Sequence, residues 1–295
     1  MMRIAINRLS VSLFILMMCV CSCNKDIVLE PEKSIVVEGW IDAGGYPVVI
    51  LTRSLPVLLG RDDGVALDDL SDYVVRWAKV TVSDGETEVI LTGGSDKDYF
   101  PPYIYTTGMI KGVPGKTYNL KVETDDQIIT ATTTIPDNPP AIDSIVISSI
   151  SNDTTLAGIN VYIKDNPGTH NFYKSFYVTD LNNHHFISSA LGVVDDALAD
   201  STFVMQIIRD GNLVEMNIDN VYYRKGTDVA LKIATMDSIS YNIWQGYEDR
   251  IRLGFSFVTS TTTNIPTNVN GGVGYWCGYN ARTCAYKVKP QTVFP

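Results

Sequence analysis

An alternation of apolar and polar residues with a period of two runs through nearly the whole chain and restricts it to β-structure. It is clear at residues 34–41 and 46–52, and again at 79–83 and 87–91, which flank Asp84-Gly85. Such alternation is typical of half-buried strands, and Asp-Gly between two of them is the strongest short hairpin signal. Further strands are predicted at 118–122, 128–134, 142–150, 159–164, 172–181, 203–209, 214–218 and 229–234. The sequence therefore predicts an all-β fold.

A proline-rich segment divides this β-rich chain into two predicted domains. The chain is too long for one sandwich of roughly 100 residues, and residues 136–141 contain three prolines, which make a stiff linker. Residues 34–135 hold short strands with turns every 8–12 residues, which predicts an antiparallel sandwich of immunoglobulin or transthyretin-like type. Residues 142–295 are expected to form a second β-sandwich-type domain.

One short helix is expected in the second domain, near residues 238–248. Asp237 can cap its first turn. A set of large apolar side chains then falls on one helical face and is interpreted as core packing rather than as a binding surface; it comprises Ile239, Ile243, Trp244 and Tyr247.

The N-terminus has the organisation of an export signal. Arg3 and Arg8 precede an apolar run at residues 9–20. This run is too short to span a bilayer, because a spanning helix needs about 20 residues. The end of the run resembles the lipobox of bacterial lipoproteins, which implies a signal peptide at 1–22 and lipidation of Cys23. Cys21 fits less well because the branched Val20 precedes it. The alternative is an ordinary cleaved signal with incidental cysteines.

The charge of the chain excludes two classes of partner. The formal net charge is −10, and it becomes more negative by two when Arg3 and Arg8 leave with the signal. Nucleic-acid binding needs clustered Lys and Arg, and anionic lipids repel an acidic surface. The link to the bilayer is therefore expected to be the acyl chains on Cys23, such as palmitate, within a lipidated tether at 23–33. Stable anchoring takes two or more chains.

Cys277 and Cys284 flank six residues that read as a hairpin tip centred between Asn280 and Ala281. Directly opposed strand residues have Cβ atoms about 4.5–5.5 Å apart, close to the roughly 3.5–4.5 Å of a disulfide. Export permits such a bond. A cross-strand disulfide is therefore predicted, with two buried free thiols as the alternative.

No constellation of catalytic or cofactor-binding residues stands out. His184 and His185 are neighbours, so on a strand they point to opposite faces and do not chelate one ion; with His170 they are the only histidines, and no metal site is expected. Residues 53–77 are acidic but lack the spacing of an EF-hand loop, which favours a solvated loop over a calcium site. Phosphate-binding and nucleophile-elbow motifs are absent from the sequence. Adjacent acids lie in polar turns, at Asp62-Asp63, Asp125-Asp126 and Asp195-Asp196. We expect a protein that is not an enzyme and uses no cofactor.

The strongest candidate contact surface is an aromatic segment beside two prolines. Tyr99, Phe100, Tyr103 and Tyr105 lie in it. Aromatic rings with polar tips suit contacts with sugars or proteins. The alternative is that alternate rings fill the sandwich core.

Several motifs, taken in order, resemble the DUF4249 lipoproteins of Bacteroidetes. They are the lipobox, Val36 to Ile41, Gly112 to Leu120, Asp237 with its helix, and Pro266 to Tyr275. The family carries no established activity or catalytic residue. The resemblance implies an outer-membrane protein encoded near TonB-dependent receptors. A second, weaker resemblance is to the Asp-Ser/Thr sites that Bacteroidetes O-glycosylate, for which Thr154 is the first candidate.

These features favour an outer-membrane lipoprotein that binds a partner or assists a TonB-dependent transporter, with a glycan or peptide as ligand. Two alternatives remain open. Self-association through edge strands would favour a surface adhesin or structural protein, and a deep pocket that holds two carboxylates would favour a glycan-active enzyme. The face of the membrane, the ligand and the oligomeric state have no signal in the sequence.

Overall fold

The computed structural model describes residues 34–53, 73–150, 153–165, 168–183, 185–197, 199, 201–209, 221–253, 266–289 and 292–294. The predicted all-β class with one helix is confirmed. The signal peptide, Cys23 and the tether lie outside the described residues. So do most of the acidic segment at 53–77 and the strand predicted at 214–218.

The described strands form two sheets. A large sheet has the order β11-β10-β14-β16-β1-β2-β5-β4-β3-β6-β7-β15, and a smaller one has the order β12-β9-β8-β17, with β13 paired to β9. The bounds are β1 Ile35–Asp42, β2 Val48–Arg53, β3 Lys79–Ser83, β4 Glu88–Gly94, β5 Ile104–Thr106, β6 Thr117–Glu123, β7 Ile128–Thr134, β8 Ile142–Ile150, β9 Asp153–Lys164, β10 Phe172–Val178, β11 Ile187–Asp195, β12 Thr202–Gln206, β13 Tyr223–Arg224, β14 Asp228–Met236, β15 Val269–Asn270, β16 Val273–Lys287 and β17 Thr292–Phe294.

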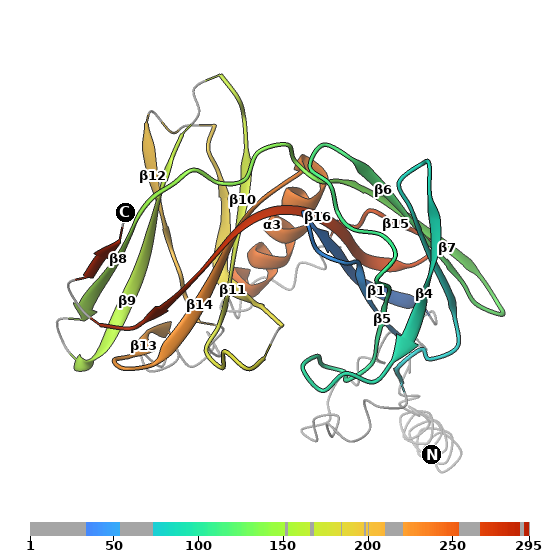
Figure 1. Ribbon diagram of the computed structural model, residues 1–295, viewed down its shortest axis with the longest axis horizontal. Coiled ribbons are helices and arrows are strands. Elements are labelled where there is room, and N and C mark those ends of the chain that lie inside the picture. Colours follow the sequence, from blue (N-terminus) through green and yellow to red (C-terminus); the bar gives the residue numbers. More distant parts are fainter. Residues whose placement is uncertain are drawn as a thin grey trace, which may run out of the picture.

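The molecule has two lobes with separate hydrophobic cores (Figure 1). The first lobe comprises β1–β7 with β15, and the second comprises β8–β14 with β17. In the second lobe the small sheet packs against β10 and β14 of the large one, so that Ile159 and Val161 meet Leu231 and Ile233. The sandwich character expected from the alternating pattern is therefore realised where two sheet faces bury their apolar sides.

The β3–β4 hairpin forms as the Asp84-Gly85 pair predicts. Ser83 opposes Glu88 across the turn, and Gly85 has φ of +90°, which an L-residue rarely adopts. The Asp84 carboxylate accepts hydrogen bonds from the backbone N–H groups of Glu86 and Thr87 at 3.1 and 2.8 Å. The local sequence thus dictates this turn.

The long strand β16 joins the lobes. Its residues 273–279 pair in parallel with β1, and its residues 280–287 pair antiparallel with β14 (Figure 1). Val269 and Trp276 lie in the core of the first lobe. A C-terminal segment that the sequence division had assigned to the second domain therefore completes the first core.

The predicted disulfide is wrong, because Cys277 and Cys284 lie on this one strand rather than on the two arms of a hairpin. Seven residues at about 3.3 Å each separate them by roughly 23 Å. Their separation is odd, so they point to opposite faces. Cys277 pairs with Trp40 and Cys284 with Leu231, and both thiols are free.

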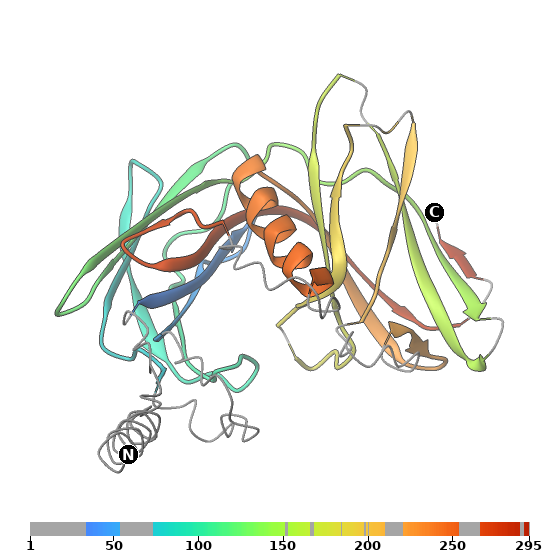
Figure 2. The ribbon, with the colours of Figure 1, turned by 180° about the vertical axis from the view of Figure 1, so that it is seen from behind.

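The predicted helix is α3, Ser238–Leu253, and it is longer than expected. Asp237 caps it, because its Oδ1 accepts the backbone N–H of Ser240 at 2.7 Å. Ile243 and Trp244 are buried as predicted, whereas Ile239 and Tyr247 are about half exposed. The interpretation of this stripe as core is therefore right for two of its four residues. Figure 2 shows α3 lying against the large sheet between the lobes.

The proline-rich linker is held against β14 and β16. The Asn280 side chain donates to the carbonyls of Pro136 and Asp137 at 2.9 and 3.0 Å, and the Thr235 hydroxyl donates to Asn138 at 2.6 Å. These bonds satisfy linker carbonyls inside the structure and tie the two lobes at their junction.

Candidate functional site

A cleft of about 1100 Å³ opens between the lobes. We call it the interlobe cleft. One wall is the face of β1 and β2 that does not pack in the first core, and the others come from residues 96–106, β10, β11, β16 and α3. Among its lining residues are Glu38, Trp40, Asp42, Tyr99, Phe100, Lys174, Phe176, His185, Ser189, Lys232, Trp244, Tyr247, Glu248, Tyr275 and Tyr279.

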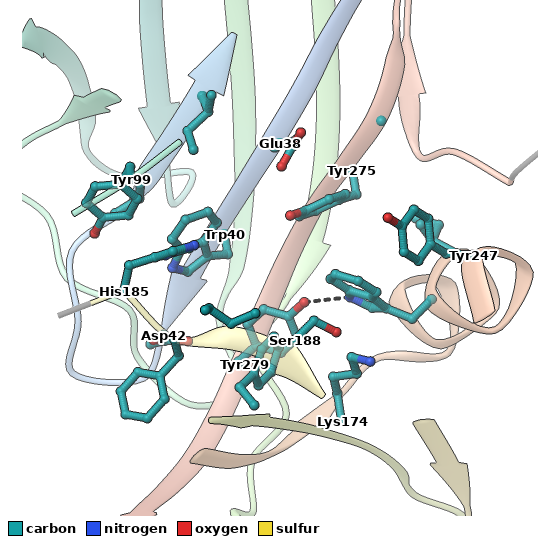
Figure 3. Close-up of a pocket in the computed structure, with 18 of the residues that line it drawn as sticks. Glu38, Trp40, Asp42, Tyr99, Lys174, His185, Ser188, Tyr247, Tyr275 and Tyr279 are labelled. Atoms are coloured by element: carbon teal, nitrogen blue, oxygen red, sulfur yellow. Dashed lines mark hydrogen bonds between the residues drawn. The ribbon is translucent and has the colours of Figure 1, made fainter. Parts of the chain in front are cut away.

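The alternation of β1 explains why its polar residues face this cleft. Residues 35, 37, 39 and 41 are buried toward the core, and the residues between them are only partly buried. Glu38, Trp40 and Asp42 therefore project together from the other face of the strand (Figure 3).

One side of the cleft carries a cluster of three rings. Trp40, Tyr99 and His185 have centroids 4.7–6.1 Å apart (Figure 3). Burial, and then the nearby charge of Lys232, lower the pKa of His185, so the ring is neutral at neutral pH. Its buried Nδ1 has no hydrogen-bond partner among the described residues.

A second ring cluster lies across the cleft. The Trp244 centroid is 5.2 Å from that of Tyr275 and 5.9 Å from that of Tyr247. The Trp244 indole N–H donates to the Tyr279 hydroxyl at 2.7 Å and is thereby satisfied (Figure 3). Tyr247 is 48% exposed, so part of its side chain is accessible to solvent.

Glu38 lies between the two clusters in Figure 3. Burial raises the pKa of its carboxyl group, and a hydrogen bond with Tyr275 lowers the pKa by less than burial raises it. Burial also raises the pKa of Tyr275. Burial therefore disfavours the charged forms of both groups.

Both lysines of the cleft have carboxylate partners. Lys174 Nζ lies 3.0 Å from Glu248 Oε1, with both side chains at most 2% exposed, and 4.7 Å from the Trp244 ring centre. Lys232 Nζ donates to both oxygens of Asp42 at 2.6 Å. The cleft thus balances its own positive charges.

The aromatic segment singled out from the sequence divides between two environments. Tyr99 and Phe100 line the cleft. Tyr105 is only 2% exposed and donates its hydroxyl proton to the carbonyl of Val75, and Tyr103 packs edge-on against Tyr105. The contact-surface interpretation therefore places two residues at the cleft, and the alternative of core packing holds for Tyr105.

The structure also brings together His170, Asp195 and Asp196, whose ligand atoms lie within 4.8 Å of one another. The sequence predicts no metal site from any of the three histidines. The register of β10 and β11 makes this cluster. Asp196 already accepts hydrogen bonds from Asn171 and Tyr173, and His170 Nε2 lies 2.7 Å from Asp195. These groups satisfy one another, and we derive no metal site from them.

Two further predictions concern modification and anchoring. Thr154 is exposed near the start of β9, so its hydroxyl is accessible, and its glycosylation stays a prediction. Lipidation of Cys23 also stays a prediction. No helix in the described part of the chain has the length and apolarity of a membrane span.

Comparison with known proteins assigns the family. No curated protein matches the chain. The family model described as "Domain of unknown function (DUF4249)" matches residues 24–284, a range that contains both walls of the interlobe cleft. The chain therefore belongs to the DUF4249 family.

Proposed function

We propose that this protein is a non-enzymatic binding component of the bacterial cell envelope. In this proposal acylated Cys23 anchors it in the outer membrane, and it assists a TonB-dependent transporter by binding a ligand in the interlobe cleft. The observation that carries the proposal is this cleft, which is lined by two ring clusters, each built from segments that lie far apart in the sequence. Concave sites lined by aromatic side chains and a few polar groups are the usual binding sites of proteins.

Anchoring supports the role physically. Acyl chains confine a protein to the membrane plane, which raises its effective concentration beside membrane partners without any new contact. The acidic chain gains little from anionic lipid. The lipid at Cys23 therefore supplies the attachment, and the lobes are left to bind.

The test is an affinity pull-down from native membranes with C-terminally tagged protein. We expect a TonB-dependent receptor to be recovered with the native protein and lost with Cys23→Ala. Trp40→Ala, which removes a ring from the cleft, tests whether the cleft contributes to recovery of the receptor. Trp77→Ala is the matched control, because Trp77 is 91% exposed and outside the cleft. Recovery of no envelope partner with the native protein would refute the accessory role.

A glycan-active enzyme is the second candidate, since the cleft holds Glu38 with a raised pKa together with Glu248. A raised pKa suits a general acid. Glu248, however, is committed to Lys174, and an ion-paired carboxylate is a poor nucleophile or base. Reducing-end release from oligosaccharides that is abolished by Glu38→Gln would favour this candidate over the binding role.

A further inference from the structure

We infer that the ligand of the interlobe cleft is a neutral oligosaccharide that spans the ring cluster of Trp40, Tyr99 and His185 and the ring cluster of Trp244, Tyr247 and Tyr275. This inference rests on the proposed binding role and specifies its ligand class. The two clusters lie on opposite sides of the cleft, with Glu38 between them (Figure 3). Tyr99 and Tyr247 lie at opposite ends of this arrangement in Figure 3, so a ligand that reaches both must be extended and must present more than one apolar face.

Anionic ligands find no available positive charge in the described part of the cleft. Lys232 holds both oxygens of Asp42 at 2.6 Å, and Lys174 holds Glu248 at 3.0 Å. His185 is neutral because of its burial. A phosphate or uronate would have to break one of these ion pairs and leave a carboxylate buried without its partner, which is costly.

Cationic ligands are disfavoured by the same pairs. Asp42 and Glu248 already have lysine partners, and Lys174 occupies a position 4.7 Å from the Trp244 ring centre. Cation–π attraction at this ring is therefore already used inside the protein. Glu38 and Asp96 are the other acids that line the cleft. Burial raises the pKa of Glu38 and so disfavours its charged form, and the Asp96 carboxylate accepts the backbone N–H of Asp98 at 3.0 Å.

Extended peptides lack their usual means of recognition on the β1 wall of this cleft. Peptides commonly bind by adding a strand to an open sheet edge. The cleft wall is instead the face of β1, whose two edges are already paired with β2 and β16. The β1 wall thus offers side chains rather than unpaired backbone groups, and β11, at the edge of the large sheet, donates the Ala190 N–H to the carbonyl of Ile208 at 3.1 Å.

The remaining groups suit hydroxyls and sugar-ring faces. Glu248 Oε2 and His185 Nδ1 are buried without a hydrogen-bond partner among the described residues, and one accompanies each ring cluster. Unpaired buried polar atoms are costly unless a ligand or water satisfies them. Sugar hydroxyls both donate and accept, and the C–H faces of a sugar are apolar enough to pack on exposed rings. A volume of about 1100 Å³ slightly exceeds the roughly 300–1,000 Å³ of most ligand sites, so it accommodates several sugar units.

Isothermal titration calorimetry of the detergent-solubilised lipoprotein tests the inference with hexamers of different charge. Cellohexaose, maltohexaose and chitohexaose are the neutral probes, the glucosamine hexamer is cationic, and the galacturonate hexamer is anionic. We expect at least one neutral hexamer to bind at least about tenfold more tightly than either charged one. Trp40→Ala and Tyr247→Ala should each weaken this binding about tenfold, as loss of a stacking ring does. Trp77→Ala should not change it.

Glu38→Gln is the variant that separates ligand classes, because it keeps the shape of the side chain and removes its capacity to ionise. The preference for the neutral over the cationic hexamer should persist in this variant, whereas binding of a cation held by Glu38 would be lost. Preference for a charged hexamer, failure of every neutral hexamer to bind, or binding that both ring variants leave unchanged would overturn the inference. Recovery of the receptor in the pull-down would leave the proposed function standing in each of these cases. Saccharide binding without any envelope partner would instead refute the accessory role alone.

Discussion

The buried pair of Lys174 and Glu248 gives the sharpest test of the cleft's energetics. The two side chains are 1% and 2% exposed, and Nζ lies 3.0 Å from Oε1. Lys174 also donates to the carbonyl of Ser189 at 3.1 Å. Lys174→Met keeps most of the volume of the side chain and removes its charge. Glu248 would then be a buried carboxylate without a cation.

We expect Lys174→Met to lose much stability, because the attraction of Lys174 would no longer offset the cost of removing the Glu248 carboxylate from water. Removing one partner of a buried pair costs about 3–5 kcal/mol, against a total stability of about 5–15 kcal/mol for a typical protein. Replacing both partners with apolar residues is often neutral or stabilising by about 1–4 kcal/mol. Lys174→Met with Glu248→Leu should therefore recover most of the loss, with a coupling energy of at least about 3 kcal/mol.

Urea unfolding followed by tryptophan fluorescence measures this cycle, with comparable m-values required across the four proteins. The exposed pair of Lys287 and Asp228, 3.1 Å apart and about half exposed, is the matched control. Its coupling should stay below about 1 kcal/mol. If the effects of the Lys174 and Glu248 substitutions on the free energy of unfolding were additive to within about 0.5 kcal/mol, the claim that this pair neutralises the cleft's buried charge would be refuted.

Three further predictions follow from particular positions. Mass spectrometry of the alkylated, denatured protein should find Cys277 and Cys284 unbridged, and in the native protein Cys284 should react first, because burial raises the pKa of Cys277 to about 12; a bridged peptide would contradict the fold of β16. The pKa of Asp84 is lowered to about 2, chiefly by the hydrogen bond from the backbone N–H of Thr87 in the same turn. The ionised Asp84 therefore stabilises the folded protein above pH 3.8, and this stabilisation is lost as pH falls through about 2. In thermal melts, the melting temperature of Asp84→Asn should fall less over this pH range than that of the native protein. Gly274→Ala should destabilise by about 3 kcal/mol in urea, since φ is +108° and the new Cβ would meet a β1 carbonyl oxygen; Gly94→Ala, with open space around it, should be nearly neutral.

The features that sequence analysis predicted correctly are local ones. The β3–β4 turn follows from Asp84-Gly85, and the start of α3 follows from Asp237, because in both cases a side chain satisfies backbone groups two or three residues away. Strands such as β6 and β7 follow from alternation, because only one of their faces is buried. Each of these signals acts within a few residues and can be read without knowing the tertiary fold.

The error at β16 shows where local signals fail. Asn280 lies where a hairpin tip was expected, yet its side chain binds the carbonyls of Pro136 and Asp137. The chain stays extended because its two halves pair with different strands, β1 and β14, which lie far apart in sequence. No pattern within residues 273–287 specifies those partners, so the strand could not be told from a hairpin.

The cleft was only partly predictable for a related reason. Alternation shows that Glu38, Trp40 and Asp42 share one face of β1, but not whether that face meets solvent, a core or a cavity. Tyr99 and Phe100 drew attention through composition alone. His185 was rejected as a metal ligand, and nothing in the sequence indicates that its ring meets Trp40 and Tyr99.

The shared strand also bears on how the cleft would bind. Opening the lobes would disrupt β16, which is hydrogen-bonded in both, and would break the Lys232–Asp42 pair and the bonds of Asn280 and Thr235 to the linker. These contacts act together at one junction, so the two ring clusters keep their spacing when the cleft is empty. A ligand that fits this spacing then binds without ordering the protein, and less of its interaction energy is lost to conformational entropy. A fixed spacing also limits length: a saccharide too short to reach both clusters gains one set of ring contacts, and a longer one gains both. Affinity that rises steeply with the number of sugar units, and then levels off, is the behaviour that this construction requires.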